Sequence, residues 1–64
     1  MHEGDLIRKL REERNMSQEV LAEKVGVSQQ YISALECGNL NPTVKSLKKV
    51  LAALNYSIYL KNTS

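Results

Sequence analysis

The sequence predicts an all-α fold of four to five short helices, followed by a short β-strand that pairs across a dimer. Apolar residues recur at steps of three and four, and a Ser or Thr stands ahead of three of these apolar runs, where helix N-caps are expected. Toward the C-terminal end the period changes to two. These observations place one domain over residues 5–55, a dimerising strand over 56–61 and a tail over 62–64.

The first two predicted helices are short, and local signals set their ends. Apolar residues recur on one side of a helix over residues 5–14. Ser17 is suited to cap the second helix, because its hydroxyl can accept a hydrogen bond from a first-turn N–H group. Gly26 is suited to end it, because glycine adopts the left-handed conformation common just after a helix.

The next two helices follow the same rules. Ser28 caps a third helix over residues 29–37, and Pro42 lies in a turn because it lacks the N–H group that a continuing helix needs. Thr43 then caps a fourth helix. Its apolar side is formed by Val44, Leu47, Leu51 and Leu54, with Val50 and Ala53 beside them.

The fourth helix has a wider apolar face than a small monomer needs, and the predicted strand has no partner within the chain. Unpaired N–H and C=O groups at a strand edge favour pairing with another chain, so we expect a homodimer with a two-stranded sheet between subunits. The expected interface residues are Val50, Leu54, Tyr56, Ile58 and Leu60. A frayed tail over the last nine residues is the alternative.

Composition excludes several kinds of site. One Cys cannot form an intrachain disulfide, and one Cys with one His falls short of the ligands that a zinc site needs. We therefore expect no metal, no cofactor and no small-molecule ligand. Nothing in the sequence resembles a signal peptide or a membrane span, so we expect a cytoplasmic protein that does not enter a membrane.

The charge is uneven along the chain, although the net charge is only +2. Residues 1–32 hold five basic and six acidic side chains, whereas residues 33–64 hold four lysines against one glutamate. A positive second half favours a polyanionic partner, and a solvated helix face is an equally simple explanation.

The second and third predicted helices, joined by a short Gly-containing turn, have the dimensions of a helix-turn-helix. The outward side of the third helix is uncharged and carries Gln30, Ser33 and Ala34, with Gln29 at its flank. Such side chains suit the DNA major groove, because they do not repel phosphate and a Gln can pair with adenine through N6 and N7. A neutral surface helix without a DNA role is the alternative.

The run MSQEVLAEKVGVSQQYISALECG (residues 16–38), followed by residues 41–43 and 47, resembles the Cro and cI-type (Xre) helix-turn-helix family. The resemblance covers about residues 5–55, with the helix-turn-helix at 17–37. It implies a lambda-repressor-like fold and a transcriptional regulator that binds double-stranded operator DNA.

The same resemblance implies roles for individual residues, with the third helix in the major groove of an inverted repeat. The residues expected to read bases are Gln29, Gln30, Ser33 and Ala34. Ala34 departs from the polar residue often found at its position, so we expect it to contact a thymine methyl group. The residues expected at the phosphate backbone are Gln18, Ser28, Tyr31, Asn39, Asn41 and Lys45. For Tyr31, packing against the second helix is the alternative.

Glu36 lies on the inner side of the third predicted helix, where an unpaired carboxylate is costly. The family resemblance implies Arg11 of the first helix as its partner, and we assign this ion pair to structure. Cys37 has no resolving Cys near it in the sequence, and no role is assigned to it.

The segment over residues 54–60 resembles the end of HipB-like antitoxins, in which a strand pairs across the dimer. It implies the antitoxin of a toxin-antitoxin pair, which represses its own operon and binds a toxin, a kinase of the HipA kind. A phage-type repressor and a restriction-modification controller protein are alternatives with the same DNA-binding mechanism. An interaction adaptor without DNA binding is a further alternative, and we do not expect an enzyme, because no catalytic residue set or phosphate-binding loop occurs.

Overall fold

The computed structural model describes residues 3–56 and contains four α-helices within that range. They are α1 (Glu3–Glu13), α2 (Gln18–Val25), α3 (Gln29–Glu36) and α4 (Val44–Ala53). Residues 3–56 contain no strand, so the predicted all-α fold is confirmed for this part of the chain. The predicted strand lies outside the described residues except for Tyr56, which follows α4 without regular structure.

The predicted N-caps are present and explain where the last three helices begin. The hydroxyls of Ser17 and Ser28 each accept a hydrogen bond at 3.1 Å from the backbone N–H three residues on. Thr43 does the same at 3.0 Å. Each cap satisfies one of the N–H groups that a helix start leaves without an intrahelical partner.

Three helix ends differ from the prediction, and one of them is the end of α1, at Glu13 instead of Arg14. α1 begins at Glu3 instead of about Asp5, and its first turn holds two acidic side chains, which favour a helix N-terminus. α3 ends at Glu36, one residue earlier than expected, and Cys37 is its C-cap.

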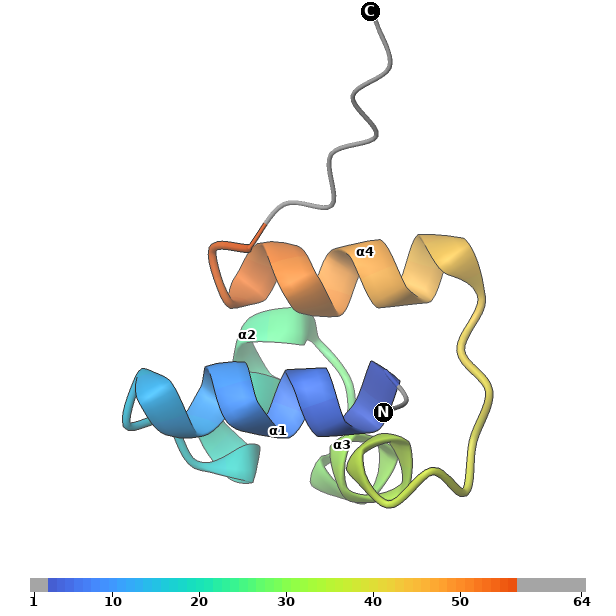
Figure 1. Cartoon of the computed structure of the whole chain (residues 1–64), viewed down its shortest axis with the longest axis horizontal. Coiled ribbons are helices and arrows are strands. Elements are labelled where there is room, and N and C mark those ends of the chain that lie inside the picture. The colour runs from blue at the N-terminus through green and yellow to red at the C-terminus, as the bar shows by residue number, and fades with distance from the viewer. Residues whose placement is uncertain (1–2, 57–64) are drawn as a thin grey trace, which may run out of the picture.

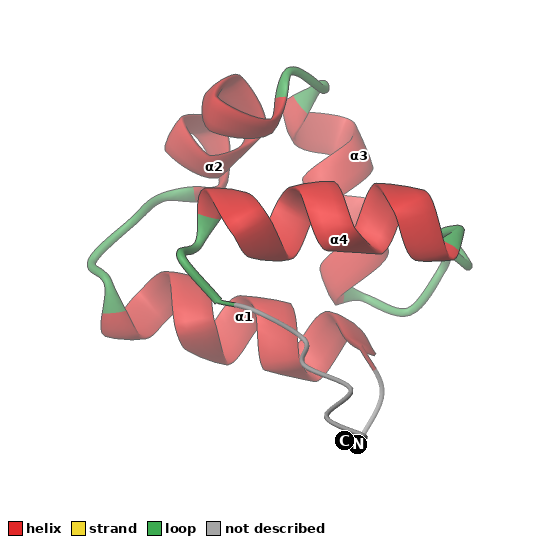
Figure 2. Ribbon diagram, turned by 90° about the horizontal axis from the view of Figure 1, so that it is seen from above, coloured by secondary structure: helices red, strands yellow, loops and turns green. Residues whose placement is uncertain are grey.

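The helices pack around one core, in which α2 contacts both α3 and α4 and α1 contacts α3. In Figure 1, α1 and α4 run across the view with α2 behind them and α3 beneath, and Figure 2 shows the same bundle from above. The buried apolar residues are Ile7, Leu10, Leu21, Ala22, Ile32, Leu35, Val50, Leu51 and Leu54. All four helices therefore contribute to the core.

The apolar face of α4 corrects one prediction. Val50 and Leu54, which we expected at a dimer interface, are each 0 % exposed within the single chain. Their side chains fill the core, so they are not a surface for a second copy. Of the other expected interface residues, Tyr56 is 38 % exposed, while Ile58 and Leu60 lie outside the described residues.

Candidate nucleic-acid interface

A tight turn of three residues joins α2 to α3. The backbone N–H groups of Gly26 and Val27 both donate to the carbonyl oxygen of Ala22, at 2.8 and 3.0 Å. Gly26 has a φ of +89°, in the left-handed region, and a Cβ built on it would meet no atom within 4 Å. The turn therefore needs glycine for its backbone conformation alone, and not because space is short.

The outward side of α3 is uncharged, as the sequence predicts. Gln29 and Gln30 at its first turn are exposed, whereas Ser33 and Ala34 one turn later are half-buried. Glu36 is the one charged residue of α3, and it is on the inner side at 2 % exposure. A helix with this distribution presents amides and small groups outward and keeps its carboxylate away from them.

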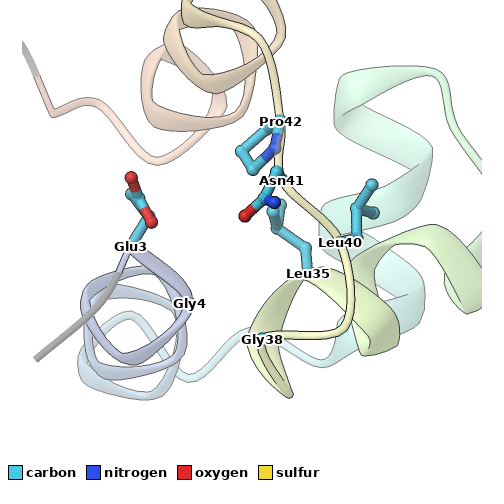
Figure 3. Close-up of a pocket in the computed structure, with 7 residues that line it drawn as sticks. All are labelled: Glu3, Gly4, Leu35, Gly38, Leu40, Asn41 and Pro42. Atoms are coloured by element: carbon cyan, nitrogen blue, oxygen red, sulfur yellow. The ribbon is translucent and has the colours of Figure 1, made fainter.

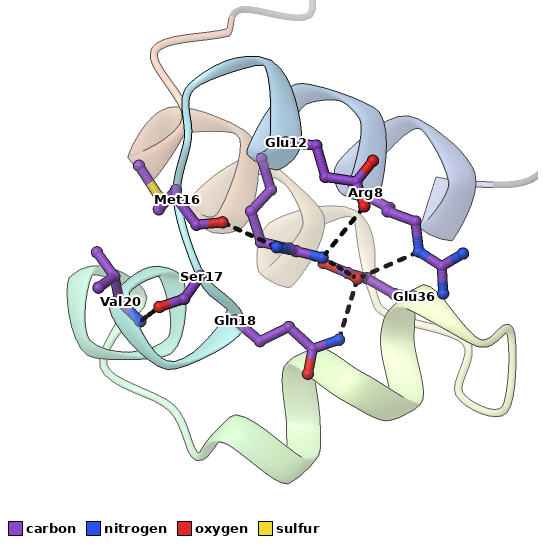
Figure 4. Close-up of polar contacts among 8 residues, drawn as sticks. Arg8, Glu12, Met16, Ser17, Gln18, Val20 and Glu36 are labelled. Carbon is purple, nitrogen blue, oxygen red and sulfur yellow. Dashed lines mark hydrogen bonds and ion pairs between the residues drawn. The ribbon is translucent and has the colours of Figure 1, made fainter.

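Glu36 receives hydrogen bonds from two other helices (Figure 4). Arg11 of α1 donates from Nε to Oε2 at 2.7 Å and from Nη2 to Oε1 at 3.0 Å. Gln18 at the start of α2 donates from Nε2 to Oε1 at 3.1 Å, and Arg8 Nε lies 3.6 Å from the same oxygen. Arg11 Nη1 also donates to the carbonyl of Met16, at 2.8 Å. One carboxylate thus connects α1, the loop after it, α2 and the end of α3.

These contacts fix the charge state of the pair. Burial raises the pKa of Glu36, but the hydrogen bonds from Arg11 and Gln18, with the charges of Arg11 and Arg8, outweigh it and hold that pKa below its ordinary value. The hydrogen bond to Glu36 in turn raises the pKa of Arg11, against the opposing effect of burial. The ion pair is therefore fully charged at neutral pH, which is the condition under which both partners are satisfied.

Gln18 has a contact that the sequence did not indicate. Because an ionised carboxylate only accepts hydrogen bonds, the amide nitrogen of Gln18 must face Glu36, and its carbonyl oxygen points the other way (Figure 4). A carbonyl oxygen repels phosphate. The first-turn N–H groups of α2, which have no intrahelical partner, are therefore the better donors to phosphate at this helix start.

The other residues expected at the phosphate backbone come from three segments of the chain. Ser28, at the start of α3, is exposed, and so are Asn39 and Asn41 in the loop after α3 and Lys45 in the first turn of α4. Tyr31 is half-buried on the flank of α3 that faces α4. The family resemblance, and no local sequence pattern, groups these residues.

A cavity of about 170 Å³ lies under the loop that follows α3 (Figure 3). Its lining includes Glu3 and Gly4 from α1 and Asn41 from the loop. The loop therefore lies over open space at this point instead of on packed side chains. Because the lining residues include one carboxylate and no cation, this cavity is unsuited to binding a phosphate.

Within residues 3–56, no cluster of three or more His, Cys, Asp or Glu residues is placed to hold a metal ion. In the same part of the chain, no helix has the length and apolarity needed to cross a bilayer. In the described part of the chain, the candidate binding groups are thus those on the outward side of α3 and the positive and amide groups around it.

Residues 7–60 match the helix-turn-helix family. The chain belongs to this family, in its Cro/cI (Xre) type. It is 43 % identical over 54 residues to the uncharacterized HTH-type transcriptional regulator y4dJ of Sinorhizobium fredii, across 84 % of this chain and 70 % of that protein. It is 39 % identical over 57 residues to the HTH-type transcriptional regulator SinR of Bacillus subtilis. That match covers 88 % of this chain but only 51 % of SinR.

Two solved structures resemble the helix-turn-helix domain closely. The crystal structure of SinR in complex with DNA superposes with a TM-score of 0.81 at 38 % identity, covering 88 % of this chain and 90 % of that chain. The crystal structure of a restriction-modification controller protein superposes with a TM-score of 0.82 at 36 % identity, covering 86 % of this chain and 71 % of that chain. The chain is therefore a DNA-binding transcriptional regulator of helix-turn-helix type, and its family is not one of enzymes.

Proposed function

We propose that this helix-turn-helix protein is a homodimeric repressor of its own operon, which reads an inverted repeat with α3 in the major groove. The observation that carries the proposal is the outward side of α3, where two exposed glutamines stand at the first turn and no charge interrupts them. In a recognition helix the N-terminal residues contact base edges, and the two glutamines are the N-terminal residues of α3.

Base reading is assigned to four residues of α3. Gln29 and Gln30 suit adenine, because a carboxamide can accept from N6 and donate to N7 at the same time. Ser33 offers a hydroxyl to either kind of partner, and Ala34 offers a methyl group to a thymine methyl. Ala34 thus supplies less discrimination than the polar residue often found at its position.

Phosphate contacts are assigned to the residues that flank α3. Ser28, Tyr31, Asn39, Asn41 and Lys45 supply side-chain donors, and the start of α2 at Gln18 supplies backbone N–H groups. With roughly four to six phosphates neutralised per dimer, counterion release gives a salt slope of about −4 to −5. Such a slope is shallow, so the protein depends heavily on base contacts for its affinity.

The two recognition helices of a dimer would meet successive major grooves, with half-site centres roughly 34 Å apart. Val50 and Leu54 take no part in the dimer contact, since the core buries them. Tyr56, the exposed residue after α4, and the alternating segment that follows it remain our assignment for that contact. A protein of this kind works in the cytoplasm, where its operator is.

The likeness to a restriction-modification controller protein favours a regulator that acts without a toxin. The antitoxin role, with a HipA-type kinase as partner, has its support in the sequence over residues 54–60 alone. We therefore keep it as the second form of the proposal, and the identity of the neighbouring gene separates the two.

The deciding experiment is a gel shift with footprinting on the DNA upstream of the gene, compared with a random duplex of equal length. We expect protection of an inverted repeat. Replacing Gln29 or Gln30 with Ala should weaken binding to that repeat by about 1 to 3 kcal/mol and change binding to random DNA little. Equal losses on both duplexes would reject base reading by α3, and no preference for the upstream DNA would favour an interaction adaptor.

A further inference from the structure

A second, smaller cavity lies between the start of α3 and the middle of α4, on a different side of the recognition helix from its outward face. It measures about 50 Å³ and is lined by Val25, Val27, Tyr31, Ser46, Lys49 and Val50. Three of these residues are valines, and the side chains of the other three carry a hydroxyl group or a positive charge. A volume of this size admits one or two water-sized groups and excludes a metabolite.

The hydroxyl of Ser46 is set up to donate into its surroundings. Thr43 Oγ1 donates to Ser46 Oγ at 3.1 Å, while Thr43 itself accepts from the backbone N–H of Ser46 at 3.0 Å. A hydroxyl has one proton and two lone pairs, so a Ser46 oxygen that already accepts still has its proton to give. A donor of this kind favours an acceptor such as a phosphate oxygen.

The charge around the cavity is positive and unneutralised. Within residues 3–56, no ion pair involves Lys49 or the other two lysines of α4. No acidic residue occurs over residues 37–56. Lys49 is exposed, so its ammonium group is free to meet an anion from solvent.

The cavity also lies on a different side of α3 from the start of α2. Tyr31 comes directly after the two base-reading glutamines, and it stands five residues before Glu36, or about 140° away around the helix. Glu36 faces the start of α2 through Gln18, so Tyr31 and the start of α2 lie on different sides of α3. A helix in the major groove has one phosphate strand on each side of it.

We propose that Tyr31, Ser46 and Lys49 form a phosphate-binding site, which holds one backbone phosphate of the DNA strand opposite the start of α2. The inference rests on the proposed DNA-binding function and extends the DNA contact of α4 from Lys45 in its first turn to the middle of the helix. The anionic oxygens enter the small cavity and accept from the Ser46 hydroxyl and the Tyr31 phenol, while Lys49 neutralises the charge. The site sets the register of α3 in the groove and reads no base.

The test uses the full chain and the matched variants Lys49→Gln and Lys48→Gln. Both lysines are exposed on α4 and adjacent in sequence, but only Lys49 lines the cavity. Affinity for a random duplex is measured against salt concentration. For Lys49→Gln we expect a slope shallower by about 0.9 per subunit, or about 1.8 per dimer, because one fewer counterion is released at each site. Lys48→Gln should keep the wild-type slope.

The outcomes separate the two proposals. If the wild type binds DNA and Lys49→Gln shows the wild-type salt slope, the phosphate site is wrong while the repressor proposal stands. The same holds if the salt slope of Lys48→Gln becomes as shallow as that of Lys49→Gln. If the wild type binds neither the upstream DNA nor the random duplex, the repressor proposal fails and the site falls with it. Far-UV circular dichroism of both variants checks that the fold is retained.

A second measurement tests the contact itself. Methylphosphonates, which remove the charge of single phosphates, are placed one at a time along the footprinted site. One position should weaken the wild type and leave Lys49→Gln unaffected, because the two changes remove the same contact. For Tyr31→Phe, the methylphosphonate at that same position should weaken binding less than it does for the wild type. Additive losses for Lys49→Gln at every position would overturn the proposal.

Discussion

Replacing Glu36 with Gln should destabilise the protein more than any other conservative change of a charged residue in the described part of the chain. Glu36 accepts three hydrogen bonds, two from Arg11 and one from Gln18. A Gln keeps one acceptor oxygen and turns an NH₂ group toward a donor, so at least one contact becomes donor against donor. The guanidinium of Arg11, with a side chain only 12 % exposed, then loses its buried counter-charge and keeps only the exposed carboxylate of Glu12, 4.0 Å from Nη2.

The size of the effect follows from this geometry. Removing one partner of a buried ion pair costs about 3 to 5 kcal/mol, and the partial exposure of Arg11 puts this pair near the lower end, at about 3 kcal/mol. In a domain of this size each kcal/mol lowers the melting temperature by about 4 to 8 °C, so the expected fall is about 12 to 24 °C. Thermal unfolding followed by far-UV circular dichroism at pH 7 measures it.

The matched control is Glu13→Gln, also a carboxylate with an arginine beside it. Glu13 lies 3.8 Å from Arg14, but its side chain is 55 % exposed, so the pair is screened by solvent. Its loss should stay within about 0.5 kcal/mol. The reasoning about the buried pair would be refuted if Glu36→Gln melted no lower than Glu13→Gln.

Three further outcomes are expected. Glu36 has a lower pKa in the folded chain than when unfolded, so its contribution to the free energy of unfolding is full above the ordinary carboxyl pKa of about 4.3 and is lost as the pH falls through the folded pKa. Glu36→Gln should therefore flatten the fall of the melting temperature at acid pH, and an unchanged fall would contradict this reasoning. Gly26→Ala should cost about 1 to 2 kcal/mol through left-handed strain alone and Gly26→Asn clearly less, whereas equal losses would point to a steric cause. Lys45→Ala should make the salt slope on random DNA shallower by about 0.9 per subunit, while the exposed Lys9→Ala on α1 should not; equal slopes for both would remove Lys45 from the DNA contact.

The parts of the fold that local chemistry decides were predictable from the sequence. A helix start depends on one hydroxyl and the N–H group three residues on, so Ser17, Ser28 and Thr43 marked the starts of α2, α3 and α4 correctly. The end of α2 depends on one backbone conformation, which Gly26 supplies. Signals of this kind lie within four residues of the feature they determine.

What the sequence could not decide is which neighbour covers a given face. The apolar side of α4 looked wide enough for a second copy, but α2 and the rest of the core already bury Val50 and Leu54. The contact of Gln18 with Glu36 joins residues 18 positions apart, and no local pattern indicates it. Lys48 and Lys49 look alike in the sequence, and only the packing of α4 against α2, beside Tyr31 of α3, places one of them at a cavity.

The buried carboxylate at the end of α3 has a consequence for how such a protein can be retargeted. Glu36 anchors the helix to α1 and α2 from its inner side, while Gln29 and Gln30 are exposed and belong neither to the core nor to that network. Under the proposed function, stability and sequence preference are therefore assigned to separate residues of one helix of eight residues. A library randomised at the two glutamines should retain folded proteins at high frequency, so the domain is a suitable framework for selecting binders to new DNA sequences.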